Sequence, residues 1–210
     1  MLKIPNIFPD SEYETRVEKL RSYMAAHNIE ACVFTSYPTI LYYTGHLYYE
    51  FGRNYGCVVT HDNICLITAL VDGGNPWRRC YGDNLVYTDW HKGNYFKAVH
   101  QLLRDIDGKV GLEFDHVSLD NYRAYTECLP KRELVDIGEA AMRMRLIKSK
   151  AETEVTRQGA RIADIGGAAV VEALYEGRDD NDKDILWTYL AEREYCEWLK
   201  SIDRNNHATM

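Results

Sequence analysis

One stretch of the chain brings together residue types that suit the binding of a small anion. Residues 47–55 read LYYEFGRNY, so Arg53 lies among aromatic side chains and directly after Gly52. A guanidinium offers five donors in a rigid fork that matches a carboxylate, and the neighbouring ring of Phe51 would strengthen the pairing by lowering the local water density. Gly52 lets the backbone turn. The alternative is an ordinary aromatic-rich strand whose tyrosines pack on the core while Arg53 is solvated.

A second polar group contains residue types that are used in acid/base chemistry. Glu113, Asp115 and His116 are close in sequence and follow a predicted strand. We interpret them as turn formers at the end of that strand, because short polar residues are typical of this position. The chain thus offers an anion-binding group without an evident base, and no catalytic residue is predicted in it.

Residues 72–79, DGGNPWRR, interrupt the pattern of regular elements. Two glycines and a proline disfavour a helix or a strand, so we expect a shaped loop that presents Trp77 together with two arginines. Two interpretations stay open. The loop faces an anion or an interface, or it packs on the domain with Trp77 as its buried plug.

The cysteines and histidines match no known ligand pattern. Six cysteines are scattered without CxxC or CxxH spacing, and the seven histidines show no HExxH motif. We therefore expect reduced thiols, most of them in the core, and neither a metal site nor a cofactor.

Composition is that of a soluble globular protein. The chain has 210 residues, of which 46% are hydrophobic and 27% charged. A formal net charge of −7 argues against nucleic acid or an anionic membrane as the main partner. No run approaches the roughly 20 apolar residues of a membrane span, and residues 1–10 lack the layout of a secretory signal. These features predict a cytoplasmic protein.

Hydrophobic periodicity predicts an α/β domain over residues 1–141. A capping box at residues 11–14 opens an amphipathic helix that runs to about Asn28. Strands and helices then alternate, which is typical of a layered mixed sheet flanked by helices. The strands are expected at residues 31–35, 55–60, 64–70, 84–89, 109–114 and 133–137, and the later helices near residues 95–103 and 118–128.

A basic connector, residues 142–148, leads to a helical segment, residues 149–210. Ser149 and Glu152 form a second capping box, and the long helix that follows keeps one apolar face to about Leu174. Small residues at 166–169 make part of this helix narrow enough for another element to approach closely. A charged break at residues 177–184 precedes one more short helix.

Several motifs, taken in order, resemble the creatinase family of creatine amidinohydrolases. The resemblance covers residues 11–175 and is more specific than the motifs shared with the wider Xaa-Pro aminopeptidase and prolidase relatives, namely YYTG at 42–45 and residues 148 and 149 with the following helix. The creatinase-like motifs are FTSY at 34–37, FGR at 51–53, DGGNPWRR at 72–79, VYTDW at 86–90, NYF at 94–96, MRMR at 142–145 and the stretch 159–174.

This resemblance implies a homodimer whose subunit joins an N-terminal α/β domain to a catalytic "pita-bread" domain and hydrolyses creatine to sarcosine and urea without a metal. It also implies an active site at the subunit boundary, where Phe51 packs against the substrate and Arg53 grips the creatine carboxylate. The acid/base histidine, the guanidinium-binding glutamates and a second carboxylate-binding arginine of the family belong to the C-terminal domain. Residues 149–175 resemble the start of that domain, and residues 176–210 diverge from it.

We therefore predict the substrate-binding and dimer-forming N-terminal part of a creatinase-like hydrolase, which acts on creatine or a similar small guanidino acid and is inactive alone. Two alternatives stay open. One is a non-catalytic partner that pairs with full-length creatinase-like subunits, for which residues 166–169 offer a surface. The other is a fragment of a metal-dependent Xaa-Pro dipeptidase, against which the motifs at 51–53 and 72–79 weigh.

Overall fold

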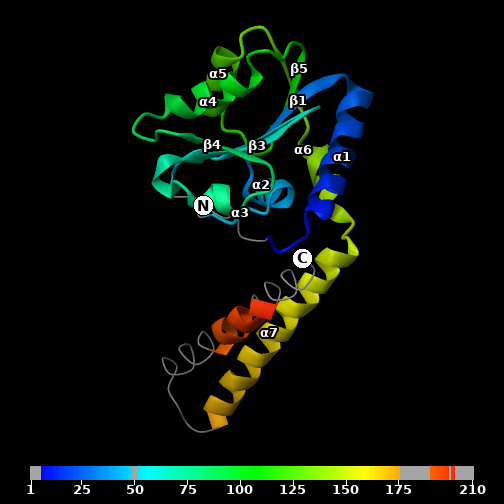
Figure 1. Cartoon of the computed structure of the whole chain (residues 1–210), viewed down its shortest axis with the longest axis vertical. Helices are drawn as coiled ribbons and strands as arrows, with labels where there is room; N and C mark the ends of the chain where they lie inside the picture. Colours follow the sequence, from blue (N-terminus) through cyan, green and yellow to red (C-terminus); the bar gives the residue numbers. More distant parts are fainter. Residues whose placement is uncertain (1–5, 49–51, 176–189, 199, 202–210) are drawn as a thin grey trace. The chain divides into compact units, whose positions relative to one another are not determined.

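The computed structural model describes residues 6–48, 52–175, 190–198 and 200–201. The chain divides into two compact units, Met1–Ile147 and Lys148–Met210, which are described separately (Figure 1). The first unit contains, in chain order, α1 (Asp10–His27), β1 (Ile29–Phe34), α2 (Tyr37–Thr44), β2 (Gly56–Thr60), β3 (Ile64–Ala69), the 3-10 helix η1 (Leu70–Asp72), α3 (Asn75–Arg79), β4 (Asp83–Tyr87), α4 (Gly93–Leu103), β5 (Lys109–Leu112), α5 (Leu119–Cys128), β6 (Glu133–Asp136) and α6 (Gly138–Leu146).

The six strands form one mixed sheet in the order β4-β3-β2-β1-β5-β6. Strand β2 runs antiparallel to β1 and to β3, while β3–β4, β1–β5 and β5–β6 are parallel pairs. Helices α4 and α5 lie on one face of the sheet, and α1, α2 and α6 lie on the other (Figure 1). The predicted α/β class with a layered mixed sheet is therefore confirmed.

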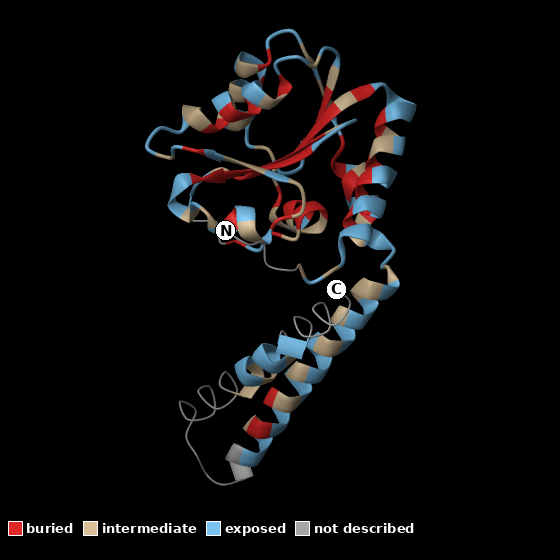
Figure 2. Cartoon of the chain, in the orientation of Figure 1, coloured by how far each residue is buried: buried red, intermediate tan, exposed pale blue. Residues whose placement is uncertain are grey.

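The central strands form the core of the unit. Every residue of β3 is buried, as are all but one residue each of β1 and β2, because helices cover both faces (Figure 2). Helix α1 buries Val17, Leu20 and Met24 from its apolar face, at the spacing that the sequence predicted. From the other face, Val99 and Leu103 of α4 are fully buried.

The start of α1 differs from the prediction. The helix begins at Asp10 with Pro9 in extended backbone at the N-cap, and no side chain caps it. Ser11 instead lies in the first turn, where its carbonyl accepts a hydrogen bond from the Thr15 hydroxyl at 2.9 Å. The predicted capping box at residues 11–14 was therefore wrong, although the helix itself is confirmed.

The stretch at residues 72–79 is also more regular than predicted. Residues 75–79 form the short helix α3, since Gly74 lies before it at a φ of 84° and Pro76 occupies the first turn, where a missing N–H costs no hydrogen bond. Pro76 is the buried residue, while Trp77 is 39% exposed. The interpretation of Trp77 as a buried plug was wrong.

Residues 142–146 of the predicted connector belong to α6. Within the first unit, this helix packs through its buried residues Ala141 and Met144. The Tyr43 hydroxyl donates to Met144 Sδ at 3.3 Å, and the Tyr42 hydroxyl donates to the Met144 carbonyl at 3.2 Å. The buried side of α6 follows the helical spacing of Gly138, Ala141 and Met144, while Met142 is 48% exposed, so most of the predicted connector is part of a packed helix.

The second unit begins with the long helix α7 (Lys150–Tyr175). Its capping box is formed as predicted: Ser149 N donates to Glu152 Oε2 at 2.9 Å, and Glu152 N donates to Ser149 Oγ at 3.1 Å. Residues 190–198 are also helical. The predicted charged break at 177–184 lies outside the described residues. In the part of the chain that is described, no helix combines the length and apolarity that crossing a membrane requires.

Candidate functional site

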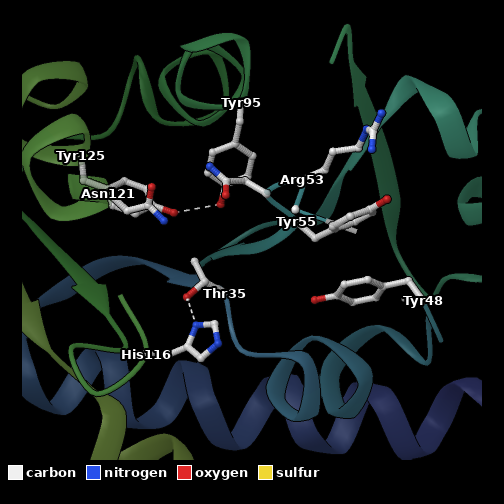
Figure 3. A pocket seen from close by; sticks show the side chains of 10 residues that line it. Thr35, Tyr48, Arg53, Tyr55, Tyr95, His116, Asn121 and Tyr125 are labelled. Atoms are coloured by element: carbon white, nitrogen blue, oxygen red, sulfur yellow. Dashed lines mark hydrogen bonds between the residues drawn. The ribbon is translucent and has the colours of Figure 1, made fainter. Parts of the chain in front are cut away.

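A pocket of about 280 Å³ lies in the first unit beside the segment that carries Arg53 (Figure 3). Thr35 and His116 in its wall follow β1 and β5, which are neighbouring parallel strands. The pocket therefore opens at the carboxyl edge of the sheet, where open α/β sheets commonly bind ligands. Its wall consists of Thr35, Tyr48, Gly52, Arg53, Asn54, Tyr55, Tyr95, His116, Asn121 and Tyr125.

Stacked aromatic rings form one side of this pocket. The rings of Tyr48 and Tyr55 lie 4.3 Å apart at 24°, and the His46 ring stacks on Tyr48 at 5.8 Å and 10°. The Tyr55 hydroxyl donates to the carboxylate of Asp72. Burial, with this hydrogen bond, raises the pKa of Tyr55 above its usual value. Tyr48 and Tyr55 of the predicted anion-binding segment thus pack on the core and hold its backbone.

Two buried phenols form the opposite side. The Tyr95 and Tyr125 hydroxyls lie 2.8 Å apart, and each side chain is 1% exposed. Burial raises the pKa of both phenols, so they act as neutral hydrogen-bonding groups. Tyr95 also approaches β2 closely: a Cβ at Gly56 would lie 2.4 Å from the Tyr95 hydroxyl oxygen, which makes glycine necessary at that position.

The acidic side chain that suggested acid/base chemistry holds the backbone instead. Glu113 is 3% exposed, and its Oε2 accepts hydrogen bonds from Thr35 N at 2.8 Å and Ser36 N at 2.9 Å. Its Oε1 accepts one from the Ser36 hydroxyl at 2.7 Å. Glu113 therefore connects the end of β5 to the start of α2.

His116 does not pair with Glu113 through its ring. Its Nδ1 lies 2.9 Å from the Thr35 hydroxyl oxygen, across the pocket wall (Figure 3). The backbone N–H groups of His116 and Val117 both donate to the Glu113 carbonyl at 3.0 Å. The interpretation of these residues as turn formers at a strand end is confirmed.

Arg53, the predicted carboxylate-binding residue, lies at the edge of the pocket. Its Nε donates to Asp89 Oδ2 at 2.5 Å, and the two side chains are 40% and 18% exposed. The hydrogen bond to Asp89 raises the pKa of Arg53, and the same bond lowers the pKa of Asp89. In Figure 3 the guanidinium extends away from Thr35 and His116. Phe51, the second predicted site residue, lies outside the described residues.

Asp89 is the site residue that sequence reasoning missed. It follows β4, whose last residue, Tyr87, donates from its hydroxyl to the Asn54 carbonyl at 2.9 Å. The end of β4 and the residues that follow it thus contact the Arg53 segment twice, through Tyr87 and through Asp89. Asp89 lies 36 positions from Arg53, so no local spacing connects them. The available signals were its position near a strand end and its place in the VYTDW motif at 86–90.

The described residues place no three His, Cys, Asp or Glu side chains together as possible ligands of one metal ion. All six cysteines are free thiols, and four of them are buried. Burial raises the pKa of Cys32, Cys57 and Cys65, which keeps them protonated and unreactive. The pocket wall offers hydroxyls, side-chain amides, an imidazole and the guanidinium of Arg53, which are groups that can bind a polar ligand.

Comparison with protein families matches residues 16–147 to the Creatinase/Prolidase N-terminal domain. The chain is 46% identical over 178 residues to a creatinase from Bacillus sp. (strain B-0618), an alignment that covers 83% of this chain and 43% of the relative. It is 25% identical over 151 residues to the uncharacterized peptidase YqhT of Bacillus subtilis, covering 71% and 40%. The chain thus spans half or less of the length of these curated relatives.

Solved structures share the fold at lower identity. The X-Pro aminopeptidase of Thermotoga maritima superposes with a TM-score of 0.68 at 19% identity, covering 85% of this chain and 49% of that one. A proline dipeptidase chain from Streptococcus pneumoniae superposes with a TM-score of 0.58 at 22% identity, covering 63% of this chain and 98% of that one. Because the family match extends over most of the first unit, the chain belongs to the Creatinase/Prolidase N-terminal domain family.

Proposed function

We propose that this chain is the substrate-binding N-terminal part of a creatine amidinohydrolase, which hydrolyses creatine to sarcosine and urea in the cytoplasm as a homodimer. The observation that carries the proposal is the 46% identity to a creatinase over 83% of the chain, whereas the identity to the uncharacterized peptidase YqhT is 25%. The FGR motif at residues 51–53 falls within this resemblance.

Arg53 supplies the chemistry that such a part needs. Its side chain is 40% exposed, so a ligand or a second subunit can reach it. A guanidinium is matched to the creatine carboxylate by charge and by its fork of donors. Phe51 would pack against the substrate beside this contact. With the carboxylate fixed, the amidine carbon at the other end of creatine is held in one place for attack by water.

Hydrolysis also requires a base that activates water and acids that localise the guanidinium charge. We assign these groups to the second domain of the whole enzyme, for which residues 149–175 form the opening helix. The active site then lies at the boundary of two subunits, where Arg53 of one subunit meets the catalytic groups of the other. This chain alone is expected to release no urea from creatine.

The test is steady-state kinetics of urea release by the whole enzyme that contains this domain. Arg53→Ala is expected to raise KM for creatine by more than about tenfold, because a charged bidentate contact is lost. Arg53→Lys is the matched control, because lysine keeps the charge without the fork of donors. Its KM for creatine should lie between those of the parent enzyme and Arg53→Ala. An unchanged KM in Arg53→Ala would remove this residue from the site, and cleavage of an Xaa-Pro dipeptide in place of creatine would replace the proposed activity.

A further inference from the structure

Two buried phenols in the pocket wall carry one more donor hydrogen than their shared hydrogen bond uses. The Tyr95 and Tyr125 hydroxyls lie 2.8 Å apart, and each side chain is 1% exposed. Each phenol has one O–H, so whichever hydroxyl donates to the other, one O–H is left over. Neither hydroxyl has another hydrogen-bond partner among the described residues. Because a buried donor without an acceptor is costly, this O–H suits an acceptor that comes from outside the chain.

Asn121 adds a side-chain amide to the same wall. It lies four positions before Tyr125 on α5, a spacing that puts both side chains on one face of the helix, and the two lie together in Figure 3. Its backbone N–H donates to Ser118 Oγ at 3.2 Å, whereas its side-chain amide makes no hydrogen bond within the part of the chain that is described. The wall thus presents a phenol O–H together with an amide, which offers both a donor and an acceptor.

This part of the wall has little with which to balance the charge of a ligand. The described residues that line the pocket include no Asp or Glu. Arg53 lies at the edge of the pocket and is paired with Asp89. Burial raises the pKa of both phenols, so they stay neutral. A charged group that moved from water to this wall would lose hydration without gaining a counter-charge, whereas a neutral polar group loses much less.

We propose that Tyr95, Tyr125 and Asn121 form a binding site for the carboxamide group of a small neutral molecule. A primary carboxamide can pair with the amide of Asn121 through two parallel hydrogen bonds, and its carbonyl oxygen has a second lone pair for the phenol O–H. The pocket of about 280 Å³ limits the ligand to a small molecule. This inference goes beyond the proposed function and uses no contact of Arg53.

The experiment uses the 210-residue chain and three probes of nearly the same shape: acetamide, acetate and acetamidinium, which are neutral, negative and positive. Each is titrated at about pH 8, to limit protonation of histidine, while the ¹⁵N–¹H signals of α5 and of the Asn121 amide are followed. Acetamide is expected to bind at least about tenfold more tightly than either charged probe. Asn121→Ala should weaken binding of acetamide by about fivefold or more. The matched control, Gln101→Ala, removes an exposed amide of α4 outside the pocket and should leave the affinity unchanged.

A change of charge at the same position gives a second test. Asn121→Asp places a carboxylate beside the phenols and should make acetamidinium the most tightly bound of the three probes. An unchanged order of the probes in this variant would contradict the proposal. Binding of acetate or acetamidinium to the parent chain as tight as that of acetamide would overturn it, as would an acetamide affinity that Asn121→Ala leaves intact or the absence of any shift of the Asn121 signals.

Discussion

Replacement of Glu113 is expected to break the link between the ends of β1 and β5. The carboxylate is 3% exposed and accepts three hydrogen bonds, two from the backbone N–H groups of Thr35 and Ser36 and one from the Ser36 hydroxyl. Glu113→Ala leaves both N–H groups without their acceptor at the start of α2. Thr35 lies in the pocket wall, so the pocket depends on the same bonds.

The size of the effect follows from these contacts. A buried polar group that loses its partner costs about 1–3 kcal/mol, so two N–H groups give a loss of about 2–6 kcal/mol in the free energy of unfolding. Glu113→Gln keeps one oxygen for the two N–H groups, and the Ser36 hydroxyl can turn to accept from the new amide. That variant should lose about 1–2 kcal/mol.

Equilibrium unfolding in urea, followed by near-UV circular dichroism of the buried tyrosines, reports on the first unit. Glu139→Ala is a suitable control, because this glutamate forms an exposed pair with Arg143 and its loss should cost less than about 0.5 kcal/mol. A loss below about 0.5 kcal/mol in Glu113→Ala would refute the structural role. Equal losses in the Ala and Gln variants would show that the charge matters and not the acceptor.

Three further predictions concern other polar groups of the first unit. Arg132 donates to the carbonyls of Leu103, Arg104 and Ile106 after α4, so Arg132→Ala should lower the free energy of unfolding in urea by about 2 kcal/mol. Tyr95→Phe leaves the buried Tyr125 hydroxyl without its partner and should cost about 1–2 kcal/mol in the same assay. Burial lowers the pKa of His46 from 6.5 to about 4, so the unfolded chain binds a proton that the folded chain excludes. Titration of His46 then leaves the free energy of unfolding unchanged above pH 6.5 and lowers it by up to about 3 kcal/mol as the pH drops toward 4.

Matched substitutions serve as controls for the Arg132 and His46 predictions. Arg132→Lys should recover part of the loss, since an ammonium reaches fewer carbonyls than a guanidinium. For His46, the free energy of unfolding is compared at pH 7.5 and 4.5 in the parent chain and in His46→Gln. A pH dependence that is the same in both would contradict the assignment, because glutamine does not titrate.

Local sequence patterns predicted the elements of the sheet well and their ends less well. Residues 11–14 and 149–152 show the same S-x-x-E pattern, yet only the second forms a capping box. Pro9 already has the extended backbone of an N-cap, so α1 begins one residue before Ser11. The pattern gives the composition of a helix start, while the backbone of the preceding residues decides which position becomes the cap.

The short helix α3 was missed for a related reason. Glycine disfavours regular structure, yet Gly73 and Gly74 lie just before the helix, where a φ of 84° at Gly74 turns the chain into it. Proline disrupts a helix only after its first turn. Residue types alone therefore did not separate a shaped loop from a helix that begins within it.

Contacts at the site between residues far apart in the sequence could not be predicted from local patterns. Arg53 was identified from its neighbours in the sequence, because its type and the adjacent glycine suggest a function by themselves. Asp89, Thr35 and His116 come from three other places in the chain, and the pairing of β1 with β5 and of β3 with β4 brings them to the same edge of the sheet. Such contacts depend on the topology, which no local spacing encodes.

The functional and structural interpretations of the Arg53 segment are parts of one arrangement. Tyr48 and Tyr55 are 8% and 5% exposed and stack at 4.3 Å, whereas the arginine between them in sequence stays at the surface. A long cationic side chain loses rotamer freedom when it binds a ligand, and this loss is smaller if its backbone and Nε are already fixed. The buried rings fix the backbone and Asp89 fixes Nε. Under the proposed function, packing of the tyrosines therefore supports carboxylate binding at Arg53, and the two interpretations of the segment are compatible.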